Sequence, residues 1–303
     1  MAPPEREFPT NGRRGTGLSR RSLLTGLAVF GGLAAAGCGR VPAEGKEEGG
    51  DLLERLRDRG TVKLGIASER PYGYINDEGE PTGTAPEIAK VIFGRLGVDN
   101  VEPVPVDFSA LIPGLKAQVF DVVSAGMYIM PERCAQVLFA DPEYQMPDSF
   151  IVPAGNPNGI TRYEDIAEQG LTLATGQAYA EIDYALAAGV PESRLMILPD
   201  QVAGLDAVSQ GRADAFAGTN LTVTGTVEGN SRVEATEAFV PIVNGEPAYG
   251  AGGFAFRLSE GNLRDAFNEK LHEMKGSGEL LEIMAPFGFT EAEMTELTAE
   301  ELC

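Results

Sequence analysis

Apolar positions follow two alternating patterns along the chain from residue 52 onward. Short apolar runs of strand length are separated by segments in which apolar residues recur every three or four positions, as on one face of a helix. Strands are predicted over residues 61–67, 101–106, 121–125, 171–175, 196–198, 213–217 and 253–256. Helices are predicted over residues 52–60, 163–168, 180–188, 203–210, 263–275, 280–284 and 290–301, with a further helix beginning at Thr84. This alternation is typical of an α/β fold.

Two of the predicted helices have recognisable start signals. Thr84 and Glu87 have the spacing of a capping box, in which each side chain bonds the other residue's backbone N–H. Ser109 follows the strand predicted over 101–106 and is a candidate cap for the helix after it. Phe108 therefore lies in a loop between a strand and a helix.

The alternation restarts after Pro153, which predicts two lobes. We assign residues 52–153 and 248–303 to lobe 1 and residues 154–247 to lobe 2. Because the chain crosses between the lobes twice, the arrangement predicts a hinged clamp that closes around a cleft.

The first 37 residues have the features of an export signal. Arg20 and Arg21 form a twin-arginine pair, and the apolar run that follows is too short to span a bilayer comfortably. Small residues precede Cys38 and resemble a lipobox, so Cys38 is the predicted lipidation site; a simple secretory signal with a chance cysteine is the alternative. The polar, glycine-rich residues 38–51 are predicted to be a tether from the lipid to the folded part.

Charge and motif content exclude several classes of function. The 24 lysines and arginines and 45 aspartates and glutamates give a net charge of −21, which argues against a nucleic-acid partner. The sequence has no H-E-x-x-H, C-x-x-C or EF-hand spacing for a metal and no Walker A motif for ATP, so no metal or cofactor is predicted. Its one histidine, His272, lies in a polar helix where it is predicted to face solvent, which leaves histidine-based nucleophilic catalysis without a base.

The segment from Gly126 to Asp141 has the strongest binding signal. A buried run stops at Gly126, and Pro131 suits the first turn of a helix, which places Arg133 beside unpaired backbone N–H groups. A guanidinium next to free N–H donors is a good receptor for one carboxylate, although a surface arginine is the simpler alternative.

Three successive strands lead to further candidate side chains at one edge of a sheet. Glu69 and Tyr72 follow the first strand, Phe108 the second, and Tyr128 and Arg133 the third. Because ligands bind at the carboxyl ends of strands in open α/β sheets, these side chains are predicted to meet at one site. The alternatives are core packing for the aromatic residues and simple solvent exposure for Glu69.

Several of these segments resemble the polar amino-acid-binding proteins of ABC importers. The resemblance covers about residues 62–289 and is carried by residues 108–115, 120–127, 131–133, 139–142 and 211–215. It implies a type II periplasmic-binding-protein fold with a mixed sheet in each lobe. It also implies that Arg133 holds the ligand's carboxylate and that Tyr72 and Phe108 flank the ligand. The residues implied to complete or close over the carboxylate grip are Gly126, Tyr128, Thr175, Gly176 and Gln177.

The sequence departs from that family's pattern at two positions. Thr219, followed by Asn220, stands where amino-acid binders usually have an aspartate for the ligand's ammonium group, and Tyr128 replaces a small hydroxyl residue. A buried ammonium without a carboxylate partner is costly, which disfavours an ordinary amino acid. With Tyr72 and Phe108, Tyr128 is predicted to complete an aromatic cage for a diffuse cation.

A cage between Arg133 and Glu69 suits a zwitterion, and the arrangement resembles that of the ectoine- and hydroxyectoine-binding proteins. The resemblance implies a monomer that captures such a solute outside the cytoplasm and delivers it to separate ABC permease and ATPase subunits. A binding protein for a polar amino acid or another compatible solute is one alternative. A cyclohexadienyl-dehydratase-like enzyme with Glu69 as acid or base is another.

Two further cysteines, Cys134 and Cys303, are candidates for a disulfide in an oxidising compartment. A small, buried, unpaired Cys134 is the alternative.

Overall fold

The computed structural model describes residues 51–303. The predicted signal peptide, the lipidation site Cys38 and nearly all of the predicted tether lie outside the described residues. Within the described part, no helix combines the length and apolar character needed to cross a bilayer.

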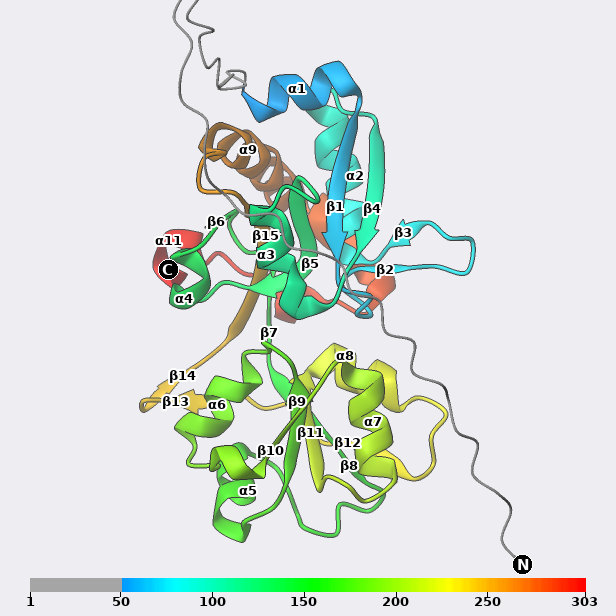
Figure 1. Cartoon of the computed structure of the whole chain (residues 1–303), viewed down its shortest axis with the longest axis vertical. Coiled ribbons are helices and arrows are strands. Elements are labelled where there is room, and N and C mark those ends of the chain that lie inside the picture. The colour runs from blue at the N-terminus through cyan, green and yellow to red at the C-terminus, as the bar shows by residue number, and fades with distance from the viewer. Residues whose placement is uncertain (1–50) are drawn as a thin grey trace, which may run out of the picture. The chain divides into compact units, whose positions relative to one another are not determined.

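The first lobe is built on a mixed sheet with the strand order β4-β1-β5-β15-β6, and β7 also pairs with β15 (Figure 1). Strands β1, β4 and β5 are parallel, whereas β15 runs antiparallel to β5. The strands are β1 (Thr61–Ile66), β4 (Asn100–Pro105), β5 (Val122–Tyr128), β6 (Leu138–Phe139), β7 (Tyr144–Met146) and β15 (Gly250–Phe256), with β2 (Tyr74–Ile75) and β3 (Pro81–Thr82) forming a separate hairpin.

Helices cover both faces of this first sheet. Val122 of β5 packs with the residues of α1, α2 and α9, whereas Val123, Ala125 and Met127 pack with Leu111 of α3 on the other side. This alternation follows from the period of two in a strand. The helices are α1 (Leu52–Arg59), α2 (Thr84–Arg95), α3 (Leu111–Lys116), α4 (Pro131–Cys134), α9 (Gly261–Ser277), α10 (Glu279–Met284) and α11 (Ala299–Leu302).

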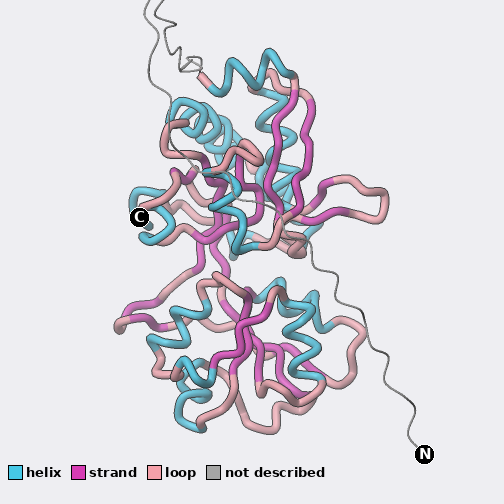
Figure 2. Tube along the Cα trace, viewed as in Figure 1, coloured by secondary structure: helices cyan, strands magenta, loops and turns pink. Residues whose placement is uncertain are grey.

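The second lobe is built on a mixed sheet with the strand order β10-β9-β11-β8-β12, shown with its helices in Figure 2. Its core has α5 and α6 on one face and α7 and α8 on the other. The elements are β8 (Asp148–Pro153), α5 (Tyr163–Gln169), β9 (Leu173–Gly176), α6 (Glu181–Ala187), β10 (Leu195–Leu198), α7 (Gln201–Ser209), β11 (Ala215–Thr219), α8 (Asn220–Val227) and β12 (Val233–Ala235).

The sheet changes earlier in the chain than the predicted lobe boundary. β8 pairs with β11 and β12 of the second sheet, although residues 148–153 were assigned to lobe 1. The first crossing therefore lies at Pro147, between β7 and β8. The return crossing follows a small hairpin of β13 (Ile242–Val243) and β14 (Glu246–Pro247) and leads into β15.

Three local expectations differ from the structure. Helix α2 has Gly83 at its N-cap, so Thr84 lies inside the helix and makes no capping bond. Ser109 lies within a 3₁₀ turn (Phe108–Ala110), and neither this turn nor α3 has a side-chain cap. The helix predicted over 290–301 is interrupted: a 3₁₀ turn (Glu291–Glu293) and α11 each begin at a threonine with its own capping box. Two start signals within twelve residues explain why one long helix does not form.

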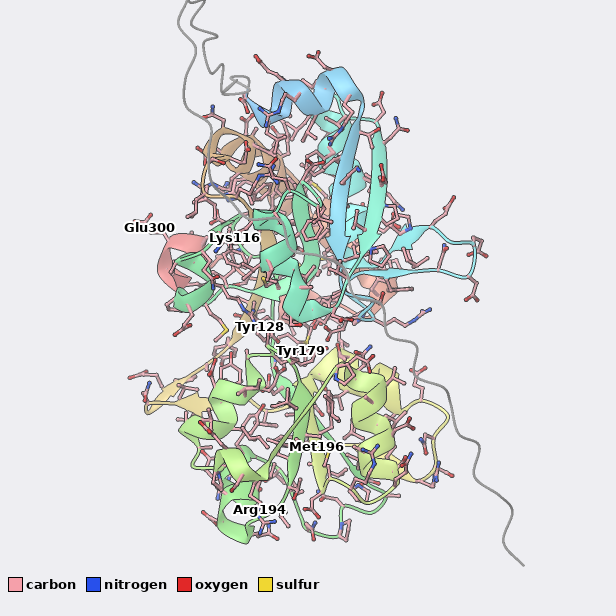
Figure 3. The ribbon with its side chains drawn as sticks, in the orientation of Figure 1. Lys116, Tyr128, Tyr179, Arg194, Met196 and Glu300 are labelled. Atoms are coloured by element: carbon pink, nitrogen blue, oxygen red, sulfur yellow. A yellow bond between two sulfur atoms is a disulfide. The ribbon has the colours of Figure 1, made fainter. Side chains whose placement is uncertain are left out.

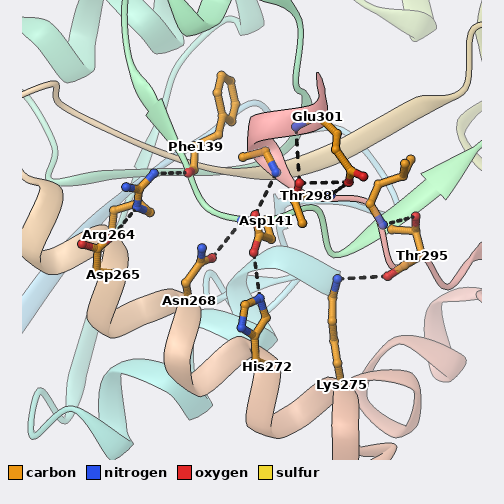
Figure 4. Close-up of polar contacts among 12 residues, drawn as sticks. Phe139, Asp141, Arg264, Asp265, Asn268, His272, Lys275, Thr295, Thr298 and Glu301 are labelled. Atoms are coloured by element: carbon orange, nitrogen blue, oxygen red, sulfur yellow. Dashed lines mark hydrogen bonds and ion pairs between the residues drawn. The ribbon is translucent and has the colours of Figure 1, made fainter. Parts of the chain in front are cut away.

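Asp141 joins the C-terminal segment to α9 (Figure 4). Its carboxylate accepts a bond from the Ala299 N–H at 2.8 Å and contacts His272 Nε2 at 2.7 Å, while its own N–H donates to Asn268 Oδ1 at 2.8 Å. His272 is exposed as predicted, but its ring is held by this contact.

Cys134 and Cys303 form a disulfide in the structure, with their Cα atoms 5.7 Å apart. The bond attaches the C-terminal residue to α4, the short helix that contains Arg133.

Candidate functional site

A small pocket lies where residues of the two lobes meet. Figure 3 labels Tyr128 of the first lobe and Tyr179 of the second in this region. The lining residues are Glu69, Tyr72, Phe108, Ala125, Gly126, Tyr128, Arg133, Tyr179, Ala180, Glu181 and Thr219. The five first-lobe side chains predicted to meet at the sheet edge are all among them.

Gly126 allows two tyrosines to approach the end of β5. Its φ is +59°, and a Cβ there would lie 2.6 Å from the Tyr72 ring and 2.8 Å from the Tyr144 hydroxyl. The Tyr144 hydroxyl donates to the Gly126 carbonyl at 2.8 Å. Any side chain at this position would therefore displace Tyr72, one of the rings of the pocket.

The aromatic side chains of the pocket are held by partners from both lobes. Tyr72 stacks on Tyr144 with ring centroids 5.2 Å apart, and its hydroxyl donates to Thr219 Oγ1 at 2.9 Å. Phe108 meets Tyr179 of the second lobe edge to face, also with centroids 5.2 Å apart. Thr219, at the position of the expected aspartate, thus orients an aromatic ring in this structure.

Glu69 lies in the loop after β1 and is almost fully buried. Its carboxylate accepts bonds from the Tyr179 hydroxyl at 3.0 Å and from Thr222 Oγ1 at 3.1 Å, both from the second lobe. Burial raises the pKa of Glu69 to about 7, and the two hydrogen bonds oppose this rise only in part. Glu69 therefore changes its charge near neutral pH.

Arg133 extends from α4, which begins at Pro131 as predicted. Its guanidinium donates to the carbonyl of Tyr128 at 2.7 Å and to that of Ala178 in the second lobe at 2.9 Å. A guanidinium has five N–H donors, so these two bonds leave donors for a carboxylate. Its central carbon also lies 5.5 Å from the centroid of the Phe108 ring.

Four predicted site residues do not line this pocket. Thr175 is buried and donates to the Ala217 carbonyl, and Gln177 is exposed. Gly176 instead allows the Tyr179 ring to lie against the backbone of β9, since a Cβ at this position would lie 2.6 Å from that ring. Asn220 begins α8, and its N–H donates to the Pro147 carbonyl at 2.9 Å.

Two side chains of the second lobe line the pocket although the sequence did not single them out. Tyr179 and Glu181 line the pocket, and Glu181 is only 2% exposed. Their position in the sequence could have indicated them. Tyr179 lies in the loop after β9 and Glu181 begins the helix after that loop. Residues that follow the carboxyl ends of strands line the cleft in sheets of this kind. An acidic residue in a helix's first turn also occurs commonly at the surface, so Glu181 did not stand out.

No group of three or more potential metal ligands occurs among residues 51–303.

Residues 62–290 match the bacterial extracellular solute-binding proteins, family 3. A probable amino-acid ABC transporter periplasmic-binding protein of Sinorhizobium fredii is 32% identical over 262 residues, which cover 84% of this chain and 87% of that protein. An arginine-binding extracellular protein of Bacillus subtilis is 28% identical and covers 71% of this chain and 80% of its own length.

Solved structures show the same fold. The structure of EhuB in complex with hydroxyectoine has a TM-score of 0.75 and 35% identity, and it covers 83% of this chain and 97% of that one. An ancestral amino acid-binding protein, a precursor of cyclohexadienyl dehydratase, has a TM-score of 0.69 and 25% identity, with coverage of 78% and 99%. The predicted α/β fold with two lobes of the type II periplasmic-binding-protein class is confirmed. The chain belongs to family 3 of the bacterial extracellular solute-binding proteins, which bind small solutes for ABC importers of the amino-acid type.

Proposed function

We propose that this protein captures ectoine or hydroxyectoine for an ABC importer. The observation that supports this best is the presence in one pocket of Arg133, Glu69 and the rings of Tyr72, Phe108 and Tyr128. The likeness to EhuB, whose structure contains hydroxyectoine, agrees with it.

The chemistry of the pocket suits a compact zwitterion. The free donors of Arg133 take the carboxylate, since charge-assisted bonds to a guanidinium are strong and directional. Glu69 takes the N–H groups of the amidinium, and the aromatic rings attract its delocalised charge by roughly 0.5–2 kcal/mol each when water is excluded.

Closure of the second lobe supplies the rest of the binding energy. Tyr179 and Thr222 of this lobe bond Glu69, and the Ala178 carbonyl accepts from Arg133, so the second lobe contacts both charged anchors. These contacts exclude water and strengthen the charge interactions around the solute. The closed protein then docks as a monomer on its permease from outside the cytoplasm, anchored through lipid on Cys38.

A basic amino acid is the second candidate solute. Glu181 adds a second carboxylate to the pocket, and the arginine-binding relative belongs to the same class of protein. We propose binding without turnover in either case, as in a transport protein and unlike the dehydratase.

Isothermal titration of residues 39–303 separates these candidates. Ectoine, hydroxyectoine, glycine betaine, glutamine and arginine are titrated separately at pH 8. One-to-one binding of the ectoines, with dissociation constants near micromolar, is expected; micromolar affinity corresponds to about −8 kcal/mol. Binding of arginine or glutamine alone rejects the ectoine assignment, and conversion of any bound solute rejects binding without turnover.

Affinity for a cationic solute is expected to fall below neutral pH. Glu69 has a pKa of about 7 in this structure, and only its ionised form attracts an amidinium. Affinity should therefore be highest above pH 7 and fall by up to about tenfold for each pH unit below it, because a bound cation must displace the proton.

The measurement is titration of the same solute at pH 8, 7, 6 and 5.5. A Glu69→Gln variant has no proton to displace and should bind weakly, with a flatter dependence on pH. Equal wild-type affinity at pH 8 and 5.5 would contradict the role of Glu69.

A further inference from the structure

Glu181 is a buried acidic side chain of the pocket that the proposed binding of a simple zwitterion does not use. It is 2% exposed, lies in the first turn of α6 and lines the same pocket as Arg133 and Glu69. Its carboxylate accepts a hydrogen bond from its own backbone N–H, and among the described residues it bonds no side chain of another residue. One such bond leaves most of the acceptor capacity of the two oxygens unused, so a donor group of the solute can still pair with it.

A second buried carboxyl group, that of Asp148, lies close enough to Glu181 to affect its charge. Asp148, at the start of β8, is fully buried; its Oδ2 accepts from the Tyr163 hydroxyl at 2.6 Å, whereas its Oδ1 has no partner within the described residues. Burial raises the pKa of Glu181 well above its usual value, and the charges of Asp148 and Glu69 raise it further. The positive charge of Arg133 lowers the pKa of Glu181, but by less than burial and the two acidic groups raise it.

A solute with one positive and one negative group uses only two of the three acidic and basic side chains that line the pocket. Glu69 and Glu181 are two acids, and Arg133 is one base. A solute carboxylate on Arg133 and a solute cation on Glu69 complete those two anchors. Glu181 then remains as an unused acceptor in the lining of the same pocket.

We propose that Glu181 is a second acidic anchor of this pocket and that it accepts a hydrogen bond from a second donor group of the solute. That group is a hydroxyl or a second cationic group, in addition to the cation held by Glu69. If the proposed function is correct, on which this form of the inference rests, Glu181 makes the protein select hydroxyectoine over ectoine. If the solute is a basic amino acid, Glu181 holds one of its two cationic groups.

The test compares pairs of solutes that differ at the group in question. Hydroxyectoine is compared with ectoine, and arginine with citrulline, whose side chain is uncharged. The titrations are made at pH 8, where Glu69 is ionised. The solute with the extra hydroxyl or cationic group makes one more hydrogen bond to Glu181. The wild-type protein should therefore bind hydroxyectoine more tightly than ectoine, or arginine more tightly than citrulline, by about tenfold. This ratio does not depend on any variant folding correctly.

Two variants then assign the preference to Glu181. Glu181→Met keeps the length of the side chain but has no strong acceptor, and its preference ratio should fall to near one. Asp183→Met removes an acid from the exposed side of the same helix and should keep the wild-type ratio. Retention of the full ratio in Glu181→Met, or its equal loss in both variants, overturns the inference.

The outcomes also separate this inference from the proposed function. Binding of both ectoines with equal affinity keeps the function and overturns the second anchor. Preference for arginine over citrulline, lost in Glu181→Met, rejects the ectoine assignment and supports the second anchor. Absence of binding to all four solutes rejects both.

Discussion

Replacing Arg133 with alanine is expected to weaken solute binding at least about a hundredfold. The guanidinium is the basic group among the residues that line the pocket, and two of its donors are used by backbone carbonyls, which leaves the others for the proposed solute carboxylate. Removing one partner of a desolvated charge pair costs roughly 2–5 kcal/mol, because the other charge stays buried and unpaired. Isothermal titration of wild type and variant with the same solute measures the loss.

Two further variants make the Arg133 result specific. Arg194→Ala removes an exposed arginine of the second lobe and should leave affinity unchanged. Arg133→Lys keeps the charge but not the planar fork, so it should bind with intermediate affinity. An Arg133→Ala protein that melts like wild type and binds within threefold of it would refute the assignment.

Replacing Glu143 with glutamine is expected to stabilise the protein at alkaline pH. Glu143 is fully buried, and neither of its carboxylate oxygens has a hydrogen-bond partner in the described residues. Burial raises its pKa from 4.5 to about 8, and the charge of Lys275 offsets this rise only in part. Between these pH values the folded form holds a proton that the unfolded form has lost, so the free energy of unfolding falls as pH rises.

The size of this effect follows from the pH window. Each pH unit contributes about 1.4 kcal/mol, so Glu143 lowers the free energy of unfolding on the order of 4 kcal/mol by pH 8.5. The melting temperature of the wild type should be lower at pH 8.5 than at pH 5.5. In Glu143→Gln this decrease in melting temperature should be smaller by roughly 5 °C or more. Part of the decrease should remain in the Glu143→Gln variant, because the pKa values of Glu69 and Asp148 are also raised in the folded protein.

Glu296→Gln is the matched control, because Glu296 also lies near Lys275 but is exposed. It should melt with the wild-type dependence on pH. A Glu143→Gln protein with that same dependence would show that Glu143 is ionised throughout the range.

The first-lobe half of the site could be predicted because its information is local. Glu69, Phe108 and Arg133 each lie within five residues of the end of a strand that the sequence predicts. Since β4, β1 and β5 are parallel neighbours, their carboxyl ends lie together. The pattern of strands and helices therefore predicted the α/β class of the fold and the side chains that meet at this edge of the sheet.

The second-lobe half depends on packing between segments far apart in the chain, which periodicity does not report. Tyr179 reaches the pocket because Gly176 leaves room for its ring, and Glu181 lines it although its helix pattern is ordinary. Asn220 was predicted because it follows Thr219 in the second-lobe segment that resembles the family, but it begins α8 and does not line the pocket. A shift of one or two residues at a loop is enough to turn a side chain away from the pocket.

The Cys134–Cys303 disulfide offers a fixed point for an optical sensor of closure. It ties residue 303 to the residue next to Arg133, so a fluorophore attached there would move with the first lobe. A second fluorophore at Ile197, an exposed residue of β10 in the other lobe, would move with the opposite sheet. Energy transfer between the two would then show whether the lobes approach each other when solute is added, as the proposed closure requires.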